Sequence, residues 1–289
     1  MCSHRAKLVL SAVAGVATLA GAATFATHRP VGSMSAAAVA ETVVLQPGAF
    51  EHPLPGEFLK DGHPVSAPRI SIEIARPLEI MKYQVSATDY QRCVQAGACR
   101  PADASGQRDT PATGVSHIDA QAYAAWYSGF TGDSWRLPTD AEWGYAAAEK
   151  FTGDIEGGEA NPANPAQRWL SLYRTESALD RRPDPVPRPR GTFGMNSKGV
   201  ADIAGNVWEW TSTCYVHASV AADGQVVPGV DNCGVHVVEG FHRTYMSNFI
   251  RDGKSGGCAV GTPPDNLGFR LVREPQSLVG RAKSFFGLS

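Results

Sequence analysis

Glycine and proline interrupt this chain so often that a bundle of long helices is excluded. The 289 residues include 30 glycines and 20 prolines. Each proline removes a backbone hydrogen-bond donor, and each glycine leaves its backbone free to turn. Hydrophobic residues make up 43% of the chain, which is enough to bury a substantial core. The composition therefore predicts a loop-rich globular fold with short helices and strands.

The first 40 residues have the layout of an export signal. A positively charged start precedes an apolar run over residues 8–26, and small residues continue to Ala40. This order is typical of a secretory signal, with candidate cleavage sites after Ala26 and after Ala40. An uncleaved membrane anchor is the alternative, because the run approaches the ~20 residues that span a bilayer. We expect residues 1–40 to be a signal peptide and linker and the mature chain to be periplasmic.

The charges of the chain are nearly balanced. Lysine and arginine number 26, aspartate and glutamate 28, and the formal net charge is -2. This balance provides no electrostatic attraction for nucleic acid or for an anionic membrane surface. We therefore expect no nucleic acid as a partner, and no membrane apart from the signal segment.

Five of the six cysteines remain once a signal is removed. In an oxidising compartment they are expected to form disulfides. Cys93 and Cys99 are close enough to close a small loop, whereas Cys214 and Cys233 can staple the ends of a longer insertion. An odd number leaves one thiol over, and by elimination Cys258 is the candidate. The sequence does not determine the connectivity.

Short helix and strand patterns are spread along the chain without a fixed repeat. Helices are predicted at residues 86–94, 119–129, 139–150 and 167–174, and strands at residues 42–45 and 70–74. One helix begins with a capping box, because Thr139 is followed three residues later by Glu142. The run 181–190 is rich in proline and arginine and is predicted to be a surface loop. We expect one domain with decorated loops.

Three segments, in order, carry a resemblance to a known family. They are Trp135–Trp143 (WRLPTDAEW), Gly199–Trp210 (GVADIAGNVWEW) and Asn266–Arg273 (NLGFRLVR), with weaker support from Tyr83–Tyr90. Over residues 42–274 the chain resembles the formylglycine-generating enzymes, or sulfatase-modifying factors. The resemblance implies an α+β fold, a loop-rich variant of the C-type lectin-like fold with few short strands and helices. It places the domain at residues 41–275, followed by a C-terminal tail (276–289).

Most residues of these motifs are expected to build the fold rather than to perform chemistry. Trp143, Trp208 and Trp210 are large side chains that can lock a core with little regular structure. Gly205 and Gly268 permit tight backbone turns. The motifs therefore indicate the fold more strongly than they indicate an activity.

The second motif also carries a candidate calcium site. The resemblance implies four calcium ligands in this segment, which fall on the side chains of Asp202 and Glu209 and the carbonyl groups of Gly205 and Val207. Hard oxygen donors of this kind suit Ca²⁺. In the alternative interpretation Asp202 caps a turn and Glu209 pairs with an arginine.

The catalytic thiols of the family are missing from this chain. In the formylglycine-generating enzymes, two cysteines five positions apart precede the third motif and use copper and oxygen to oxidise a cysteine of the substrate protein. Counted back from Asn266, these positions fall on His242 and Ser247. An imidazole and a hydroxyl cannot replace a thiolate pair that binds a soft metal ion. Formylglycine synthesis is therefore not expected.

The segment that replaces the thiols, residues 237–252, is rich in ionisable groups. The candidate catalytic residues in and beyond it are Glu239 and His242 as general acid or base, Arg243 and Arg251 as anion-binding groups, and Cys258 as a free thiol. Copper or iron as a cofactor stays open in this interpretation. In the alternative, Arg251 and Asp252 form structural ion pairs and Cys258 forms a disulfide.

This segment and the proline-rich loop are similar to two exported subgroups of the family. One comprises accessory proteins encoded with copper nitrite reductases, and the other comprises periplasmic proteins that mature the pyoverdine siderophore chromophore. The leading hypothesis is an accessory or maturation protein that binds a protein or peptide partner, such as a periplasmic metalloenzyme. The alternatives are a periplasmic oxidase that matures a peptide siderophore chromophore and a calcium-stabilised binding module.

Overall fold

The structure, a computed structural model, describes residues 39–104, 106–154, 166–178, 186–255 and 264–275. From Val39 onward the chain forms one compact unit. The predicted signal segment up to residue 38, Cys258 and the whole of the predicted tail lie outside the described residues. Within the described ranges, no helix is both long and apolar enough to cross a membrane.

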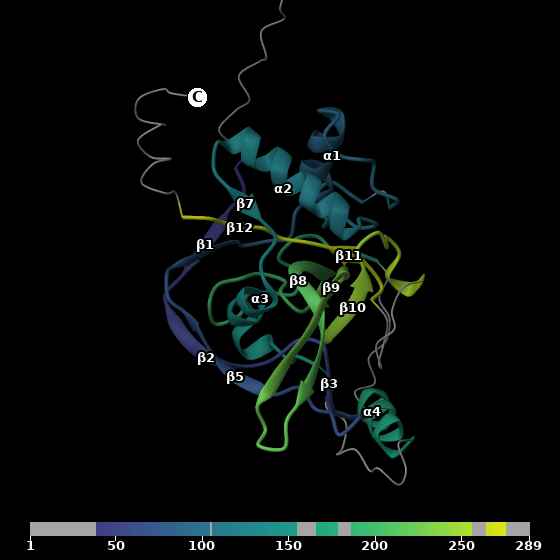
Figure 1. Ribbon diagram of the computed structural model, residues 1–289. Coiled ribbons are helices and arrows are strands. Elements are labelled where there is room, and N and C mark those ends of the chain that lie inside the picture. The colour runs from purple at the N-terminus through teal and green to yellow at the C-terminus, as the bar shows by residue number, and fades with distance from the viewer. Residues whose placement is uncertain (1–38, 105, 155–165, 179–185, 256–263, 276–289) are drawn as a thin grey trace, which may run out of the picture. The chain divides into compact units, whose positions relative to one another are not determined.

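A four-stranded sheet joins the two ends of the domain. Its strands, in spatial order, are β1 (Thr42–Leu45), β6 (Leu78–Met81), β12 (Val272–Arg273) and β7 (Trp135–Arg136), and all neighbours are antiparallel. The last of the described strands therefore lies between two strands from the first half of the chain (Figure 1). In this way the third motif closes a sheet that the N-terminal segments begin.

A second, six-stranded sheet contains the longest strands. Its spatial order is β10 (Arg243–Ser247), β9 (Val226–Glu239), β8 (Trp208–Val220), β3 (Glu57–Lys60) and β4 (His63–Val65), and β11 (Leu267–Gly268) pairs in parallel with β8. The strands β2 (Gly48–Pro53) and β5 (Arg69–Ile74) form a separate antiparallel pair, and β3 and β4 lie between them in the chain.

The expectation of short strands alone was wrong for β8 and β9. They contain 13 and 14 residues and form one long antiparallel hairpin. Shifts in their register fall on both sides of Cys214 and again after His217. Such irregularities break the alternation of inward and outward residues, which is the signal that a strand normally leaves in a sequence.

The helices begin where the sequence predicts. They are α1 (Ala87–Gln95), α2 (His117–Thr131), α3 (Asp140–Ala147), continued by a 3₁₀ turn (Ala148–Lys150), and α4 (Ala166–Ala178), with a second 3₁₀ turn at Gly253–Ser255. Ser86, Ser116 and Thr139 cap α1, α2 and α3 by accepting a hydrogen bond from a backbone N–H of the first turn. The capping box predicted at Thr139 is confirmed, and α2 has one as well.

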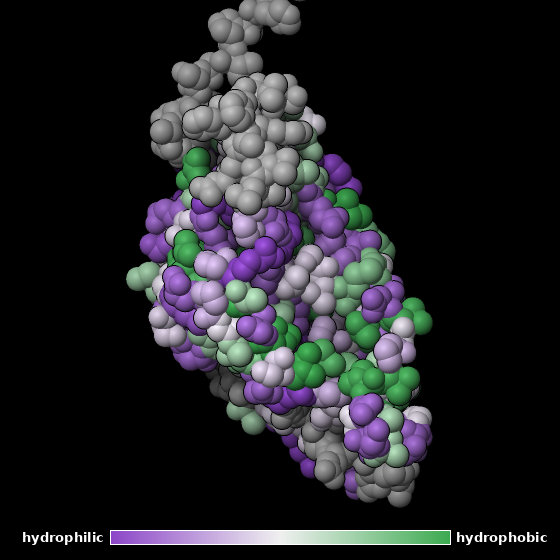
Figure 2. Space-filling view, turned by 60° about the vertical axis from the view of Figure 1, so that its left-hand side comes forward, coloured by the Kyte–Doolittle hydropathy of each residue, from purple (hydrophilic) through white to green (hydrophobic). Residues whose placement is uncertain are grey.

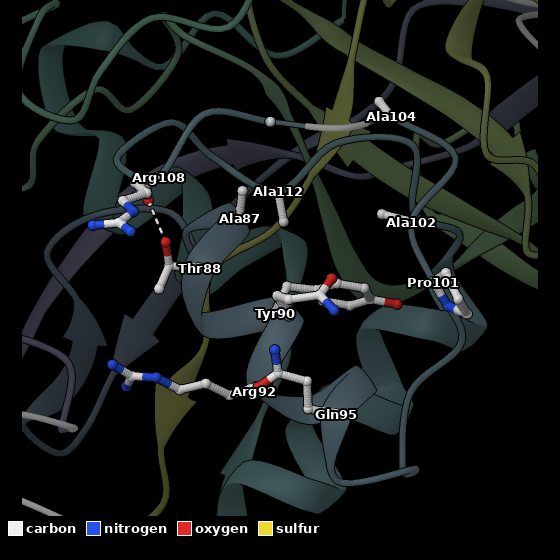
Figure 3. A pocket seen from close by; sticks show the side chains of 12 residues that line it. Ala87, Thr88, Tyr90, Arg92, Gln95, Pro101, Ala102, Ala104, Arg108 and Ala112 are labelled. Atoms are coloured by element: carbon white, nitrogen blue, oxygen red, sulfur yellow. Dashed lines mark hydrogen bonds between the residues drawn. The ribbon is translucent and has the colours of Figure 1, made fainter.

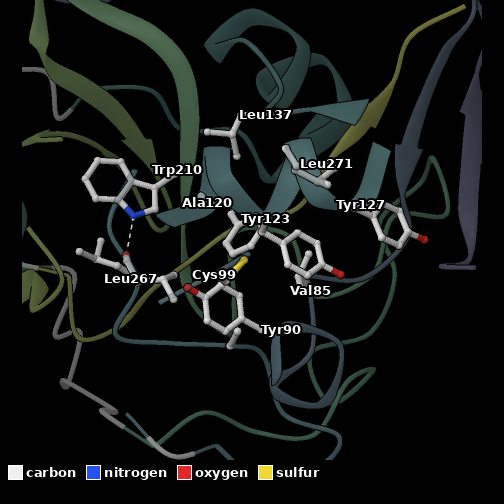
Figure 4. Close-up of a cluster of buried hydrophobic side chains, with 14 of the residues drawn as sticks. Val85, Tyr90, Cys99, Ala120, Tyr123, Tyr127, Leu137, Trp210, Leu267 and Leu271 are labelled. Carbon is white, nitrogen blue, oxygen red and sulfur yellow. Dashed lines mark hydrogen bonds between the residues drawn. The ribbon is translucent and has the colours of Figure 1, made fainter. Parts of the chain in front are cut away.

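Aromatic side chains fill the larger of two core clusters, where α1 and α2 pack side by side (Figure 1). The rings of Tyr90 and Tyr123 stack with centroids 5.9 Å apart, and Phe269 of the third motif meets Tyr123 edge-on at 5.3 Å. Trp210 donates a hydrogen bond from Nε1 to the Val115 carbonyl at 2.9 Å (Figure 4). Each aromatic pair adds ~0.5–1.5 kcal/mol beyond the burial of its area, so the motif residues stabilise the fold.

The three motifs meet at one buried ion pair. Glu209 of the second motif receives hydrogen bonds from Arg270 of the third at 2.6 and 2.8 Å, and both side chains are 0% exposed. Trp143 of the first motif donates to the same carboxylate at 2.9 Å, and Gln84 donates to it at 2.8 Å. All of the carboxylate's partners are thus donors, which satisfies a charge that burial alone would make costly.

Two disulfides form with the pairings that the spacing allowed. Cys93–Cys99 links the end of α1 to the loop that follows it. Cys214–Cys233 links β8 to β9, so it clamps neighbouring strands of one hairpin rather than the ends of an insertion. All four cysteines that the structure describes are therefore bonded to one another.

We expect Glu209→Gln to lower the free energy of unfolding by about 3–5 kcal/mol, because it leaves the Arg270 charge buried without a counter-charge. Chemical denaturation measures the change. Glu41→Gln is the matched control, since it removes an exposed pair with Lys82 and should cost less than about 1 kcal/mol. A loss at Glu209 no larger than that at Glu41 would contradict a central role for the buried pair.

Candidate functional site

The second and third motifs meet the turn between β9 and β10 at a small cavity. Its volume is about 50 Å³, and it is lined by Val186, Phe193, Gly205, Asn206, Trp208, Phe241, Asp265 and Asn266. Organic ligands occupy pockets of roughly 300–1,000 Å³, whereas a space of this size takes a few water molecules. In this conformation the cavity does not admit a substrate.

His242 lies behind the wall of this cavity. Its ring meets Trp208 edge-on with centroids 4.7 Å apart, its Nδ1 is 2.8 Å from the Arg243 carbonyl oxygen, and the residue is 3% exposed. A Cβ at Gly240 would lie 2.4 Å from the Trp208 ring, so only glycine fits this turn. The motif tryptophan and the turn therefore fix the position of His242 together.

The two positions expected for a thiol pair do not face one another. His242 directly precedes β10, and Ser247 is the last residue of that strand, where it pairs with Val235 of β9. Five residues of extended chain span about 16 Å. Two ligands at these positions cannot share one metal ion, which adds a geometric reason to the chemical one against formylglycine chemistry here.

Behind the turn, Arg243 is the centre of a buried network of charges. Its side chain is 0% exposed and binds Asp140 at 2.9 Å, Glu239 at 3.0 Å and Asp154 at 2.9 Å. His52 lies 2.6 Å from the Asp140 carboxylate through its Nε2. One guanidinium thus meets three carboxylates, and the histidine stands against one of them.

Glu239 and Asp140 shift the pKa of one another in opposite directions. Burial raises the pKa of Glu239 well above its usual value, and the adjacent Asp140 charge raises it further. Burial also opposes the ionisation of Asp140, but Arg243 and His52 outweigh it and lower the pKa of Asp140 to about 2. The protonated form is therefore favoured at Glu239 rather than at Asp140. Both residues are 1% exposed, so the pair is shielded from solvent.

His52, Asp140 and Asp154 were not singled out by the sequence as site residues. In the sequence Asp140 belongs only to the predicted start of a helix, and His52 is 191 positions away from Arg243. The one local signal was the spacing of Glu239 and Arg243, which pair across the turn as residues i and i+4. No local pattern connects the other members of the network to them.

Arg251 belongs to a different part of the domain. It pairs with Asp119 at 2.7 Å and with Asp103 at 2.6 Å. Asp119 closes the capping box of α2, so Arg251 stabilises the start of that helix. These contacts match the alternative interpretation, in which Arg251 forms structural ion pairs. The contacts that the described residues make with its guanidinium group do not include Glu239 or His242. Cys258 lies outside the described residues.

The carboxylates of the expected calcium site have other partners. Asp202 accepts hydrogen bonds from the backbone N–H groups of Gly191 at 2.5 Å and Phe193 at 2.8 Å. Glu209 is held by the ion pair with Arg270. The contacts match the alternative interpretation, in which Asp202 caps a turn and Glu209 pairs with an arginine.

Calcium does not fit these residues in this conformation. A guanidinium already covers both oxygens of Glu209, and a metal ion bound there would stand against its positive charge. The remaining expected ligands, the carbonyl groups of Gly205 and Val207, do not make a site without the two carboxylates. Across the described ranges, no group of three or more His, Cys, Asp or Glu residues is placed to hold a metal ion.

A larger cavity lies beside α1 (Figure 3). Its volume is about 460 Å³, and its lining is Ala87, Thr88, Tyr90, Gln91, Arg92, Gln95, Pro101, Ala102, Ala104, Gly106, Arg108 and Ala112. Arg92 and Arg108 lie on one side and Pro101 on the other, with Tyr90 between them. This volume is in the range of ligand pockets. Small apolar side chains and the polar or charged side chains of Thr88, Gln91 and Arg92 share this lining.

Hydrophobic side chains do not gather into one broad area on the face in Figure 2. They lie in several separate groups among hydrophilic residues. Large exposed hydrophobic residues come from distant elements, such as Ile118 on α2, Tyr173 on α4 and Val230 on β9. On this face a partner site built on a single apolar patch is not indicated.

Sequence and fold together identify the family. Residues 28–275 match the Sulfatase-modifying factor enzyme 1-like domain (FGE-sulfatase). The chain therefore belongs to this family, as its three motifs predict, and it has the family's α+β, C-type lectin-like fold. The match begins within the segment expected to be a signal and linker.

Relatives with different names share this domain. The formylglycine-generating enzyme of Mycobacterium tuberculosis is 35% identical over 128 residues, 40% of this chain and 40% of that protein. Inactive C-alpha-formylglycine-generating enzyme 2 of Bos taurus is 30% identical over 164 residues, 56% of this chain and 50% of that protein. The aligned part is thus no more than half of either relative. PvdO from Pseudomonas aeruginosa has a similar fold, with a TM-score of 0.52 and 22% identity over 82% of this chain and 95% of that one.

We expect Glu239→Gln to lose less stability than the wild type as the pH rises from 5 to 9. Because the pKa of Glu239 is higher in the folded than in the unfolded chain, its contribution is complete below about pH 4.5 and declines as the pH rises through the folded-state pKa. Glutamine mimics the protonated acid, since it can donate to Asp140 and accept from Arg243. Melting temperatures of both proteins between pH 5 and 9 test this, and parallel curves would contradict it.

Chelation tests calcium at Asp202 and Glu209. A ligand that binds only the folded state raises the melting temperature, and its removal lowers it. Because Arg270 already occupies the Glu209 carboxylate, we expect EDTA to leave the melting temperature unchanged. A drop that added calcium reverses, and that Asp202→Asn abolishes, would restore the calcium site.

Proposed function

We propose that this protein is an exported accessory or maturation factor that binds a protein or peptide partner, with a periplasmic metalloenzyme such as copper nitrite reductase as the leading candidate. The observation that carries the proposal is the loss of the family's thiol pair. His242 and Ser247 stand at the positions counted for it, and the extended strand β10 separates them. Without this thiol pair, the fold of the family can serve to bind a protein or peptide partner.

The two cavities differ in a way that favours binding over catalysis. The motif cavity, beside His242, has about 50 Å³, whereas the α1 cavity has about 460 Å³. The α1 cavity contains two arginines and small apolar residues. Arginine is enriched where proteins recognise other proteins. We therefore assign partner binding to the α1 cavity.

The second candidate function is a periplasmic oxidase that acts on a peptide-derived substrate, such as a siderophore chromophore. It is favoured by the convergence of Trp208, Phe241 and Asn266 at one cavity, with His242 behind it. It requires the small cavity to open and a redox metal or cofactor to bind. Loss of activity with His242→Ala while the fold is retained would favour this function over the first.

The accessory function is tested by the metal content of the partner. In a strain that lacks this chain, we expect the copper bound per subunit of the periplasmic nitrite reductase to fall several-fold. The wild-type chain and His242→Ala should both restore it. Arg92→Glu with Arg108→Glu should not, because reversing both charges of the cavity repels a partner that the wild type attracts.

Arg100→Glu is the matched control for these charge reversals. Its side chain is 73% exposed and does not line the cavity, so this variant should restore copper like the wild type. A nitrite reductase that has its full copper content and full activity in the absence of this chain would contradict the accessory function. The purified chain should also bind the reductase directly, with an affinity that the double reversal weakens about tenfold or more.

A further inference from the structure

The disulfide between β8 and β9 differs from the other one in its surroundings. Cys233 is exposed and Cys214 is half-buried, whereas Cys93 and Cys99 are 0% and 7% exposed. The strand register shifts on both sides of Cys214. An incoming thiol can therefore reach one sulfur of this disulfide without opening the core.

A buried histidine stands beside the less exposed sulfur. Cys214 and His236 are direct cross-strand partners, so their side chains lie on the same face of the hairpin. Nε2 of His236 is 4.0 Å from Cys214 Sγ. His236 is 6% exposed, and its ring stacks on that of His117 with centroids 3.6 Å apart. The stacking fixes the plane of the imidazole next to the sulfur.

The hydrogen bonds of His236 indicate where its proton lies. Within the described ranges, its Nδ1 is buried without a hydrogen-bond partner. A buried N–H without an acceptor is rarer and costlier than a buried lone pair without a donor. The favoured tautomer therefore carries its proton on Nε2, which is the nitrogen next to Cys214 Sγ. Burial lowers the pKa of His236, so the ring is a neutral donor.

We propose that Cys214–Cys233 is a thiol–disulfide exchange site for an external dithiol, with His236 as the group that stabilises the leaving sulfur. A disulfide sulfur accepts a hydrogen bond only weakly, but a thiolate accepts strongly. The N–H of His236 therefore gains a strong acceptor at the moment when Cys214 leaves. A leaving thiol with a lower pKa leaves faster.

The reaction proceeds in two balanced steps. A thiolate of the dithiol attacks Cys233 Sγ, a mixed disulfide forms there, and the bond to Cys214 breaks with its electron pair on Cys214 Sγ. The second thiolate of the dithiol then attacks the mixed disulfide and releases the Cys233 thiolate. The dithiol is oxidised to a disulfide and both cysteines are reduced, and the two protons of the dithiol end on the two cysteine sulfurs.

The buried Cys93–Cys99 disulfide provides an internal control. Free thiols of the purified, oxidised protein are first blocked with one alkylating reagent, dithiothreitol is added at pH 7, and newly released thiols are trapped with a second reagent. Peptide mass spectrometry then gives the rate for each cysteine. We expect Cys214 and Cys233 to be released at least about tenfold faster than Cys93 and Cys99. Equal rates would overturn the proposal.

Two variants separate the role of His236 from simple exposure. His236→Phe keeps a ring to stack on His117 but removes the donor, and it should slow release of Cys214 about tenfold. His236→Gln keeps an N–H donor and should retain most of the rate. An unchanged rate in His236→Phe would overturn the role of the histidine. A rise in the rate of Cys93 would report that a variant has unfolded.

If the variants fail to fold, the pKa of Cys214 in the wild type tests the role of His236. The reduced protein is alkylated across a pH range, and the midpoint for Cys214 gives its apparent pKa. We expect a midpoint below the ~8.5 of an ordinary cysteine, because the His236 N–H stabilises the thiolate. A midpoint at or above that value would contradict the assignment.

Discussion

The ion pair between Glu209 and Arg270 holds together segments that lie far apart in the chain. Arg270 also donates to the carbonyl oxygens of Met81 and Ala201, so one guanidinium joins the end of β6, the turn before β8 and the third motif. Trp143 brings α3 to the same carboxylate. One buried ion pair whose partners are all specified thus connects segments that the backbone ladders of the two sheets do not join.

A second pair lies directly beside the first on the same sheet. Glu209 and Glu239 are cross-strand partners of β8 and β9, and α3 packs on both strands. Each glutamate has its own arginine, but their surroundings differ. Glu209 meets only donors, whereas burial and the charge of Asp140 raise the pKa of Glu239. Two residues of one type on neighbouring strands therefore lie in different electrostatic surroundings.

Contacts between residues close together in the sequence could be predicted from it, and contacts between distant segments could not. The caps at Ser86, Ser116 and Thr139 were predictable because each is bonded within three residues. The spacing of the cysteines suggested both disulfide pairings, although it did not determine the connectivity. The network around Arg243 was not, because its members come from segments up to 191 positions apart. Because their register shifts, β8 and β9 do not show the regular alternation by which a long strand is recognised in a sequence.

The position of β12 has a consequence for how the chain acquires its structure. This strand is the last of the described strands in chain order, yet it lies between β6 and β7 in the middle of a sheet. Until it arrives, those two strands face each other across a gap with unpaired backbone groups, and the carboxylate of Glu209 lacks Arg270. Contacts of such long sequence separation make folding slow. During synthesis the domain therefore stays incomplete until its last dozen described residues are available, and a chain truncated before them exposes two sheet edges to aggregation.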